Sequence, residues 1–170
     1  MLSAALAKII FHKDLRQFDD ALRVVDETGE RFIGGKWKYL RDLSDQQLIT
    51  LLGYPGQQDR MLAASELLRE ESDILMEEGR SDESVVQGMK AFSLVVELIA
   101  NEEYHLTMIN REKFDGLLKR LEDSGFPGSL DLKRFRYYEI TGHFGKAEDI
   151  LFDLMGEDPA VFHHGMSFYQ

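Results

Sequence analysis

YEITGHFGKAEDILFDLMGEDP, residues 138–159, predicts two short antiparallel helices joined by a tight turn. Gly142 can adopt the left-handed conformation that often follows the last turn of a helix. After it, Ala147, Leu151 and Leu154 are spaced i, i+4 and i+7, which gives one apolar face to a second helix. The small side chain of Ala147 would let the two helices approach closely. The stretch therefore predicts a helical hairpin.

The order of residue types in this hairpin resembles the tetratricopeptide repeat, a helix-turn-helix unit of about 34 residues. The positions that match its motif are Tyr138, Gly142, Phe144, Ala147 and Pro159. The first half departs from it, because Asp131 stands where the motif has Trp and Phe135 where it has Gly or Ala. The resemblance implies a fold built from stacked helical hairpins.

Two other segments carry weaker forms of the same unit. In residues 77–98, Gly79 stands at the turn and Ser84 at the helix crossing, while residues 13–27 offer Ala21 at the crossing position without a turn glycine. The sequence thus predicts an all-α fold, an irregular tetratricopeptide-like stack of antiparallel helical hairpins with roughly 8 to 9 helices.

The order of segments along most of the chain also resembles an uncharacterised family of small bacterial helical proteins, a domain of unknown function. The segments that carry this resemblance are ALAKII (5–10), FDDAL (18–22), LSDQQLITLL (43–52), AASELLREESDILMEEGRSDES (63–84) and YYEITGHFGKAEDILFDL (137–154). The resemblance implies an all-helical fold and brings no activity with it.

We expect a single domain over residues 1–170, with two segments outside the regular repeat. Residues 33–57 form an insertion, in which the only tryptophan, Trp37, lies in a loop that packs an aromatic anchor onto the helices. In the same insertion, Ser44 and Gln47 form a capping box that starts a short helix. Residues 157–170 are expected to cap the end of the stack, because terminal repeats need a cover for their apolar face.

Composition argues against several classes of protein. The chain has 31 acidic and 20 basic residues, a net charge of −11, and such a surface repels nucleic acids and anionic lipids. The absence of cysteine excludes disulfides and thiolate metal sites and is compatible with a cytoplasmic location. The apolar N-terminal segment is short and interrupted by Lys8, so we expect neither a signal peptide nor a membrane span.

Catalytic or metal-binding candidates are few. Glu102 and His105 form an E-x-x-H pair on one helix face, but a di-iron site needs a second such pair, which the sequence lacks. His163 and His164 are neighbours and would point in different directions on a helix, and His143 is expected to meet the carbonyl groups that end the preceding helix. The acidic residues of the 59–78 helix, Glu66, Glu70, Glu77 and Glu78, are expected to form a solvent-exposed charged face.

These observations favour a non-catalytic protein-protein interaction or adaptor module without a cofactor. A peptide-clamp domain would carry Lys and Asn on its first helices, whereas this chain has Leu132, Arg136, Arg69 and Asp73 there, so a basic or apolar partner fits better. Self-association through the aromatic C-terminal tail remains open. The alternative is a helical enzyme or metal-binding protein that uses Glu102 and His105.

Overall fold

A computed structural model of the protein describes residues 2–34, 37–100, 107–125 and 128–157. These residues form nine α-helices and one short 3₁₀ helix, and they contain no β-strand. The predicted all-α class and the predicted number of helices are therefore confirmed for the described part of the chain. No helix among these residues is both long and apolar enough to cross a membrane.

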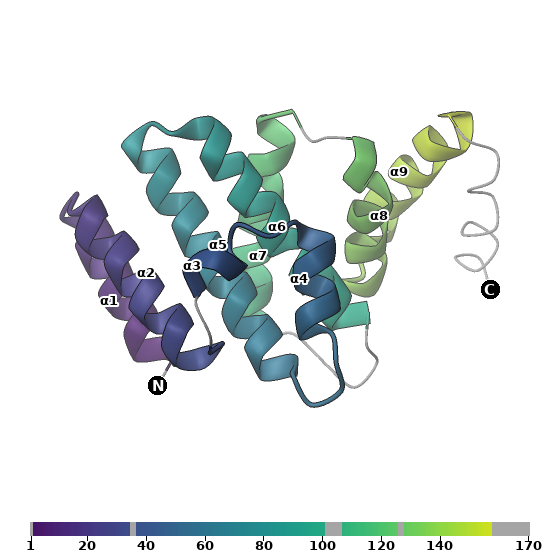
Figure 1. The fold of residues 1–170 in the computed structure, drawn as a ribbon. Helices are drawn as coiled ribbons and strands as arrows, with labels where there is room; N and C mark the ends of the chain where they lie inside the picture. The colour runs from purple at the N-terminus through teal and green to yellow at the C-terminus, as the bar shows by residue number, and fades with distance from the viewer. Residues whose placement is uncertain (1, 35–36, 101–106, 126–127, 158–170) are drawn as a thin grey trace. The chain divides into compact units, whose positions relative to one another are not determined.

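The helices follow one another with short connections (Figure 1). Their bounds are α1 (Leu2–Asp14), α2 (Phe18–Phe32), α3 (Trp37–Leu40), α4 (Asp45–Leu52), α5 (Gln58–Glu78), α6 (Ser81–Ala100), α7 (Met108–Asp123), the 3₁₀ helix η1 (Gly128–Leu130), α8 (Asp131–Ile140) and α9 (Phe144–Glu157).

Local sequence accounts for the helix ends. The predicted capping box of α4 is present: Ser44 Oγ accepts a hydrogen bond from the Gln47 amide at 3.2 Å, and the Ser44 amide donates to Gln47 Oε1 at 2.9 Å. At the start of α7, Thr107 is the N-cap, and its hydroxyl accepts a hydrogen bond from the otherwise free Asn110 amide.

The chain is divided into two compact units, residues 1–124 and residues 125–170. The first contains α1 to α7, and the second contains η1, α8 and α9. A single domain over residues 1–170 and a tetratricopeptide-like stacking of its hairpins stay predictions.

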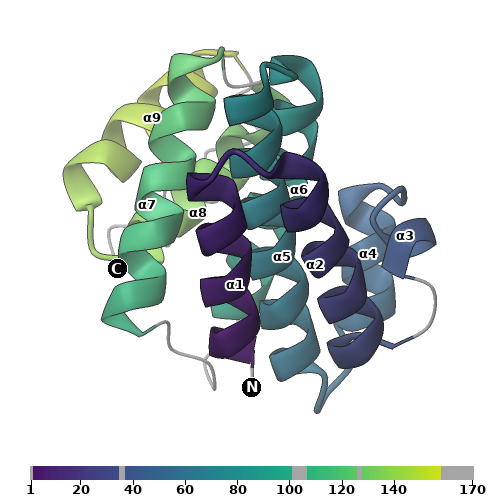
Figure 2. The ribbon, with the colours of Figure 1, turned by 90° about the vertical axis from the view of Figure 1, so that its left-hand side faces the viewer.

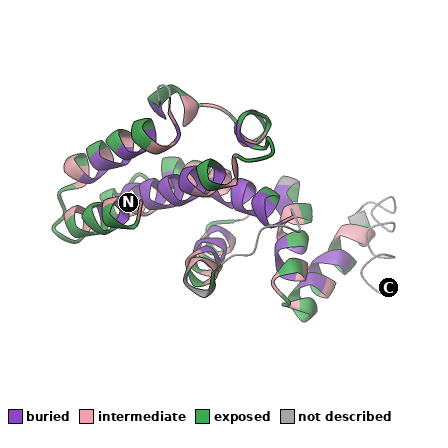
Figure 3. Ribbon diagram, turned by 90° about the horizontal axis from the view of Figure 1, so that it is seen from below, coloured by how far each residue is buried: buried purple, intermediate pink, exposed green. Residues whose placement is uncertain are grey.

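The centre of the first unit is the antiparallel pair α5 and α6, whose residues are mostly buried (Figure 3). The two helices cross at small residues. Ser84 Oγ donates a hydrogen bond to the Ser72 carbonyl at 2.7 Å, and a Cβ atom added to Gly88 would lie 3.0 Å from Ser72 Oγ. The small residues Ser84 and Gly88 therefore let the α5 and α6 backbones approach closely.

Helix α3 is fixed to α2 by the side chain of Trp37. Where the sequence predicted a loop, residues 37–40 form a short helix, and the indole of Trp37 is fully buried. A Cβ atom added to Gly29 of α2 would lie only 2.2 Å from the indole ring. The indole thus occupies the space that any side chain at position 29 would fill.

In the second unit, α8 and α9 form the hairpin predicted from residues 138–159. Gly142 has φ +78°, so it takes the left-handed conformation expected of it, and the amide of His143 donates to the Tyr138 carbonyl at 2.8 Å. Ala147 is fully buried, as are most of the aromatic residues of α8. The small residue therefore lies within the packed face of α9.

We predict that Gly29→Ala destabilises the protein, because the indole of Trp37 must move to admit the new methyl group. Overpacking of this kind costs about 1 to 3 kcal/mol in the free energy of unfolding, measured by urea denaturation. The matched control is Gly116→Ala, in the middle of α7, where an added Cβ atom meets no other atom within 4 Å. That control should raise stability by about 0.5 to 1 kcal/mol, and equal effects of the two changes would contradict the assigned packing.

Ala147→Leu provides a second test of the helix packing. The larger side chain has no space at a fully buried position, so we expect a loss of about 1 to 3 kcal/mol in the free energy of unfolding. Thermal unfolding of the variant would show this loss as a lower Tm. An unchanged Tm would mean that the crossing of α8 and α9 lies elsewhere.

Candidate functional site

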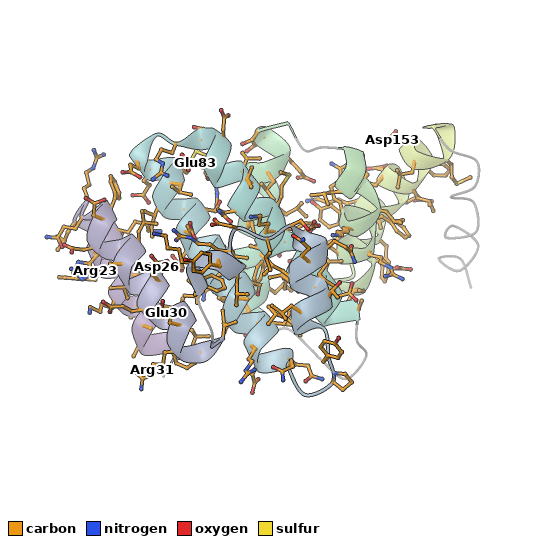
Figure 4. All side chains as sticks on the ribbon, in the orientation of Figure 1. Arg23, Asp26, Glu30, Arg31, Glu83 and Asp153 are labelled. Atoms are coloured by element: carbon orange, nitrogen blue, oxygen red, sulfur yellow. The ribbon has the colours of Figure 1, made fainter. Side chains whose placement is uncertain are left out.

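Two of the acidic residues of α5, Glu66 and Glu70, are buried, which contradicts the expectation of an exposed charged face. The side chains of Glu66 and Glu70 are 2% and 1% exposed, whereas Glu77 near the helix end is exposed as predicted. The expectation was wrong for Glu66 and Glu70 because α5 is the central helix of the first unit, with neighbours on most of its sides. In contrast to these buried residues of α5, the charged side chains Arg23, Glu30 and Arg31 of α2 are exposed and point outward (Figure 4).

Arg69 lies at the centre of this buried cluster. Its guanidinium contacts Glu66 Oε2 at 3.1 Å, Glu70 Oε1 at 2.5 Å and Asp73 Oδ2 at 3.2 Å. The four residues are spaced i, i+3, i+4 and i+7, so they lie on one face of α5. One cation thus bridges three carboxylates on the same helix.

Three further cations reach this face from other helices. Lys13, at the end of α1, lies 3.7 Å from Asp73, and Lys113 of α7 lies 3.2 Å from Glu66. Arg120 of α7 also forms an ion pair with Asp73. Together with Arg69, these residues place four positive charges around three carboxylates, two of which are buried, and they join α1 and α7 to α5. We call this group of seven residues the Arg69 cluster.

Burial and pairing act in opposite directions on these groups. Burial raises the pKa of the Glu70 carboxyl above its usual value, although the charge of Arg69 partly offsets that effect. Burial alone would lower the pKa of Arg69, but the charges of Glu70, Glu66 and Asp73 outweigh it and raise that pKa. Arg69 therefore stays charged and holds the cluster together.

A second buried charge, Glu71, faces the other side of α5. Its Oε1 lies 3.3 Å from Nη1 of Arg41, which follows α3, and the same nitrogen donates to Asp26 of α2 at 2.9 Å. Lys90 of α6 donates to the carbonyl oxygen of Arg41 at 2.7 Å. We call these four residues the Glu71 junction, and they join α2, α3, α5 and α6.

Glu71 is only partly compensated by nearby cations. Burial raises the pKa of Glu71 to about 7, although Arg41 opposes the shift. Its Oε2 is buried and makes no hydrogen bond, as is also true of Glu66 Oε1 and Glu70 Oε2. Arg41 shares its charge between two carboxylates, and Lys90, whose charge also favours the ionised form of Glu71, donates to a carbonyl oxygen. Glu71 is thus a buried carboxyl that can change protonation near neutral pH.

A groove between α1 and α7 opens onto the Arg69 cluster. Figure 2 shows α1 between α2 and α7. The groove has a volume of about 510 Å³, and apolar side chains of α1 line one wall, while Asn110 and Lys113 of α7 line the other. Glu66 of α5 lies at its base. Oε2 of Glu66 is paired with Arg69 and Lys113, whereas Oε1 of the same carboxylate is buried and makes no hydrogen bond.

A shallower apolar hollow lies on the outer face of α4. Its volume is about 430 Å³, and its lining residues are Leu43, Gln46, Gln47, Thr50, Leu51 and Tyr54. The side chains of Leu51 and Tyr54 are 46% and 64% exposed. No charged residue lines the hollow, and it falls within the insertion predicted over residues 33–57.

The remaining predicted site residues do not converge in the described structure. Glu102 and His105 lie outside the described residues, as do His163 and His164. The ring of His143 contacts the Thr141 hydroxyl at 3.0 Å and packs edge-on against Tyr138, instead of meeting the helix carbonyls directly. Across residues 2–34, 37–100, 107–125 and 128–157, no group of three or more His, Asp or Glu side chains is placed to hold a metal ion.

Both buried charge groups were missed by reasoning from sequence. A signal was present: Glu66, Arg69, Glu70 and Asp73 combine both signs of charge at helical spacing, within a helix long enough to be central. The same spacing also occurs on exposed helices, so the pattern alone does not distinguish the two. Burial of these charges depends on which helices pack around α5.

A search of protein-family models, curated proteins and solved structures finds no match to the chain. The resemblances to the tetratricopeptide repeat and to the bacterial helical family therefore stay predictions.

We predict that Arg69→Met strongly destabilises the protein at neutral pH, because it leaves buried carboxylates without their shared cation. Breaking a buried ion pair from one side costs about 3 to 5 kcal/mol in the free energy of unfolding, measured by urea denaturation. The control Arg23→Met removes the same charge from the exposed pair with Asp20 and should cost about 0 to 1 kcal/mol.

A double variant separates the charge effect from lost packing. Adding Glu70→Gln to Arg69→Met removes one of the uncompensated charges, so the second change should recover part of the lost stability. If each change instead lowers the free energy of unfolding and the two losses add in the double variant, Arg69 acts through packing and the assignment of the cluster is wrong.

Proposed function

We propose that this protein is a non-catalytic interaction module and that the outer face of α4 is its contact surface. The observation that carries this proposal is the apolar hollow formed by Leu43, Leu51 and Tyr54 with three uncharged polar residues. Exposed apolar side chains that gather on one helix of a protein with a strongly charged surface mark a site of contact.

The position of α4 supports this role. Leu48 and Leu52 on its inner face are buried, and α4 packs against α5 and α6. The helix is thus held from behind while Leu51 and Tyr54 remain available to a partner. A helix with Leu51 exposed on it and Tyr54 exposed just after its end fits the composition of protein interfaces, in which aromatic residues are enriched.

The chemistry of the partner follows from the surroundings of the hollow. Asp42 and Asp45 lie at the start of α4, and the whole chain carries a net charge of −11. A partner segment with an apolar anchor and basic flanking residues would complement both features. The proposal includes a tetratricopeptide-like fold. It also includes a cytoplasmic location, which the absence of cysteine favours.

The proposal is preferred to a ligand-binding role for the groove between α1 and α7. Oε2 of Glu66 in that groove is paired with Arg69 and Lys113, so a ligand that binds this oxygen would have to compete with existing ion pairs. On α4, by contrast, a partner covers apolar surface and breaks no ion pair among the residues of the hollow.

The test is affinity capture with the tagged full chain from a lysate of its source, compared with the double variant Leu51→Glu/Tyr54→Glu. We expect specific partners that the double variant no longer recovers, because two charges in the hollow oppose apolar contact. The control Val86→Glu changes an exposed apolar residue of α6 and should retain the partners. Recovery of the same proteins by wild type and double variant, or of background alone by both, would contradict the proposal.

A further inference from the structure

The Glu71 junction attaches the part of the chain that holds α3 and α4 to the rest of the first unit. We call residues 37–52, which hold α3 and α4, the α3–α4 segment. Three contacts attach the first part of this segment: the Trp37 indole against Gly29, the Arg41 guanidinium with Asp26 and Glu71, and the Arg41 carbonyl with Lys90. Two of the three contacts run through Arg41.

Glu71 is a buried carboxyl, and the cation paired with it, Arg41, belongs to the short α3–α4 segment. Glu71 is 5% exposed and forms an ion pair with Arg41, which it shares with Asp26, while the charge of Lys90 also favours its ionised form. If Arg41 moves away, water reaches Glu71 and the carboxylate no longer needs a partner. Attachment of the segment and the state of Glu71 are therefore coupled through this contact.

We propose that the Glu71 junction is a proton-controlled latch, which holds the α3–α4 segment against α2, α5 and α6 when Glu71 is protonated and loosens it when Glu71 is ionised. The charged groups that face the junction come from every neighbouring element: Asp26 of α2, Arg41 and Asp42 after α3, Asp45 of α4 and Lys90 of α6. Acidic groups are the majority among them, and they oppose ionisation of Glu71.

The direction of the effect follows from proton binding in the two states. In the attached state burial raises the pKa of Glu71 to about 7, while detachment exposes the carboxyl and returns its pKa toward the ordinary 4.5. The attached state thus binds the proton more tightly, and raising the pH from 4.5 through 7 shifts the equilibrium toward detachment. Above both values the carboxyl is ionised in either state, so the shift ends there.

The latch would regulate the contact surface on α4, and this consequence rests on the proposed function. Detachment moves the scaffold behind Leu51 and Tyr54, so partner binding through α4 would weaken as the pH rises. The latch itself requires no partner, because it is a property of the junction. A failure of the α4 contact surface would leave the latch intact, and the experiment below measures the latch alone.

Amide hydrogen exchange of the full chain tests the proposal. After correction for intrinsic exchange rates, the opening constant of amides in α3 and α4 should rise by up to roughly two orders of magnitude between about pH 5 and about pH 8. Glu71→Gln keeps the side chain neutral and should abolish this rise. Glu97→Gln removes the same charge from an exposed position of α6 and should leave it unchanged.

A second measurement distinguishes local detachment from global unfolding. In the wild-type chain, low concentrations of denaturant should hardly change exchange in α3 and α4, while exchange of buried amides in α5 should accelerate, because a local opening exposes little new surface. The latch is overturned if the opening constant of α3 and α4 does not change with pH, or if the Glu71→Gln variant retains the change. It is also overturned if these amides exchange only through the global unfolding that exposes the amides of α5.

Discussion

The first unit depends on the neutralisation of charges buried on α5. A carboxylate removed from water is strongly unfavourable unless a cation or hydrogen-bond donors replace the lost solvent. Helix α5 buries Glu66, Glu70 and Glu71 and can supply only Arg69 from its own buried face. The remaining cations must come from other helices, so the positions of these helices are constrained by charge as well as by apolar packing.

This constraint selects the neighbours of α5. An apolar face of a helix accepts many partners, because hydrophobic burial is not directional. An ion pair is selective, since only a helix with a cation at the right position can complete it. Lys13 selects the end of α1, and Lys113 and Arg120, two turns apart on α7, fix the register of that helix. Buried ion pairs add little net stability, and their contribution here is to specify the arrangement.

The predictable features of the fold were those that depend on neighbours in sequence. The capping box at Ser44 and the turn at Gly142 follow from local backbone chemistry, and both were found from sequence. The burial of Glu66 and the approach of Trp37 to Gly29 depend on segments distant along the chain. Sequence pattern placed the helices well because periodicity is local, and it misjudged α5 because a mixed-charge face looks the same whether water or other helices surround it.

The two sides of α5 differ in how their carboxylates are paired with cations. The Arg69 cluster has four cations for three carboxylates, and each carboxylate forms at least one ion pair. On the opposite side, Arg41 must serve both Glu71 and Asp26, and the carboxyl of Glu71 is left near the midpoint of its titration at neutral pH. One helix therefore carries a network of ion pairs on one face and a carboxyl with a pKa near neutrality on the other. The network joins α1 and α7 to α5, whereas Glu71 joins the segment that bears the proposed contact surface.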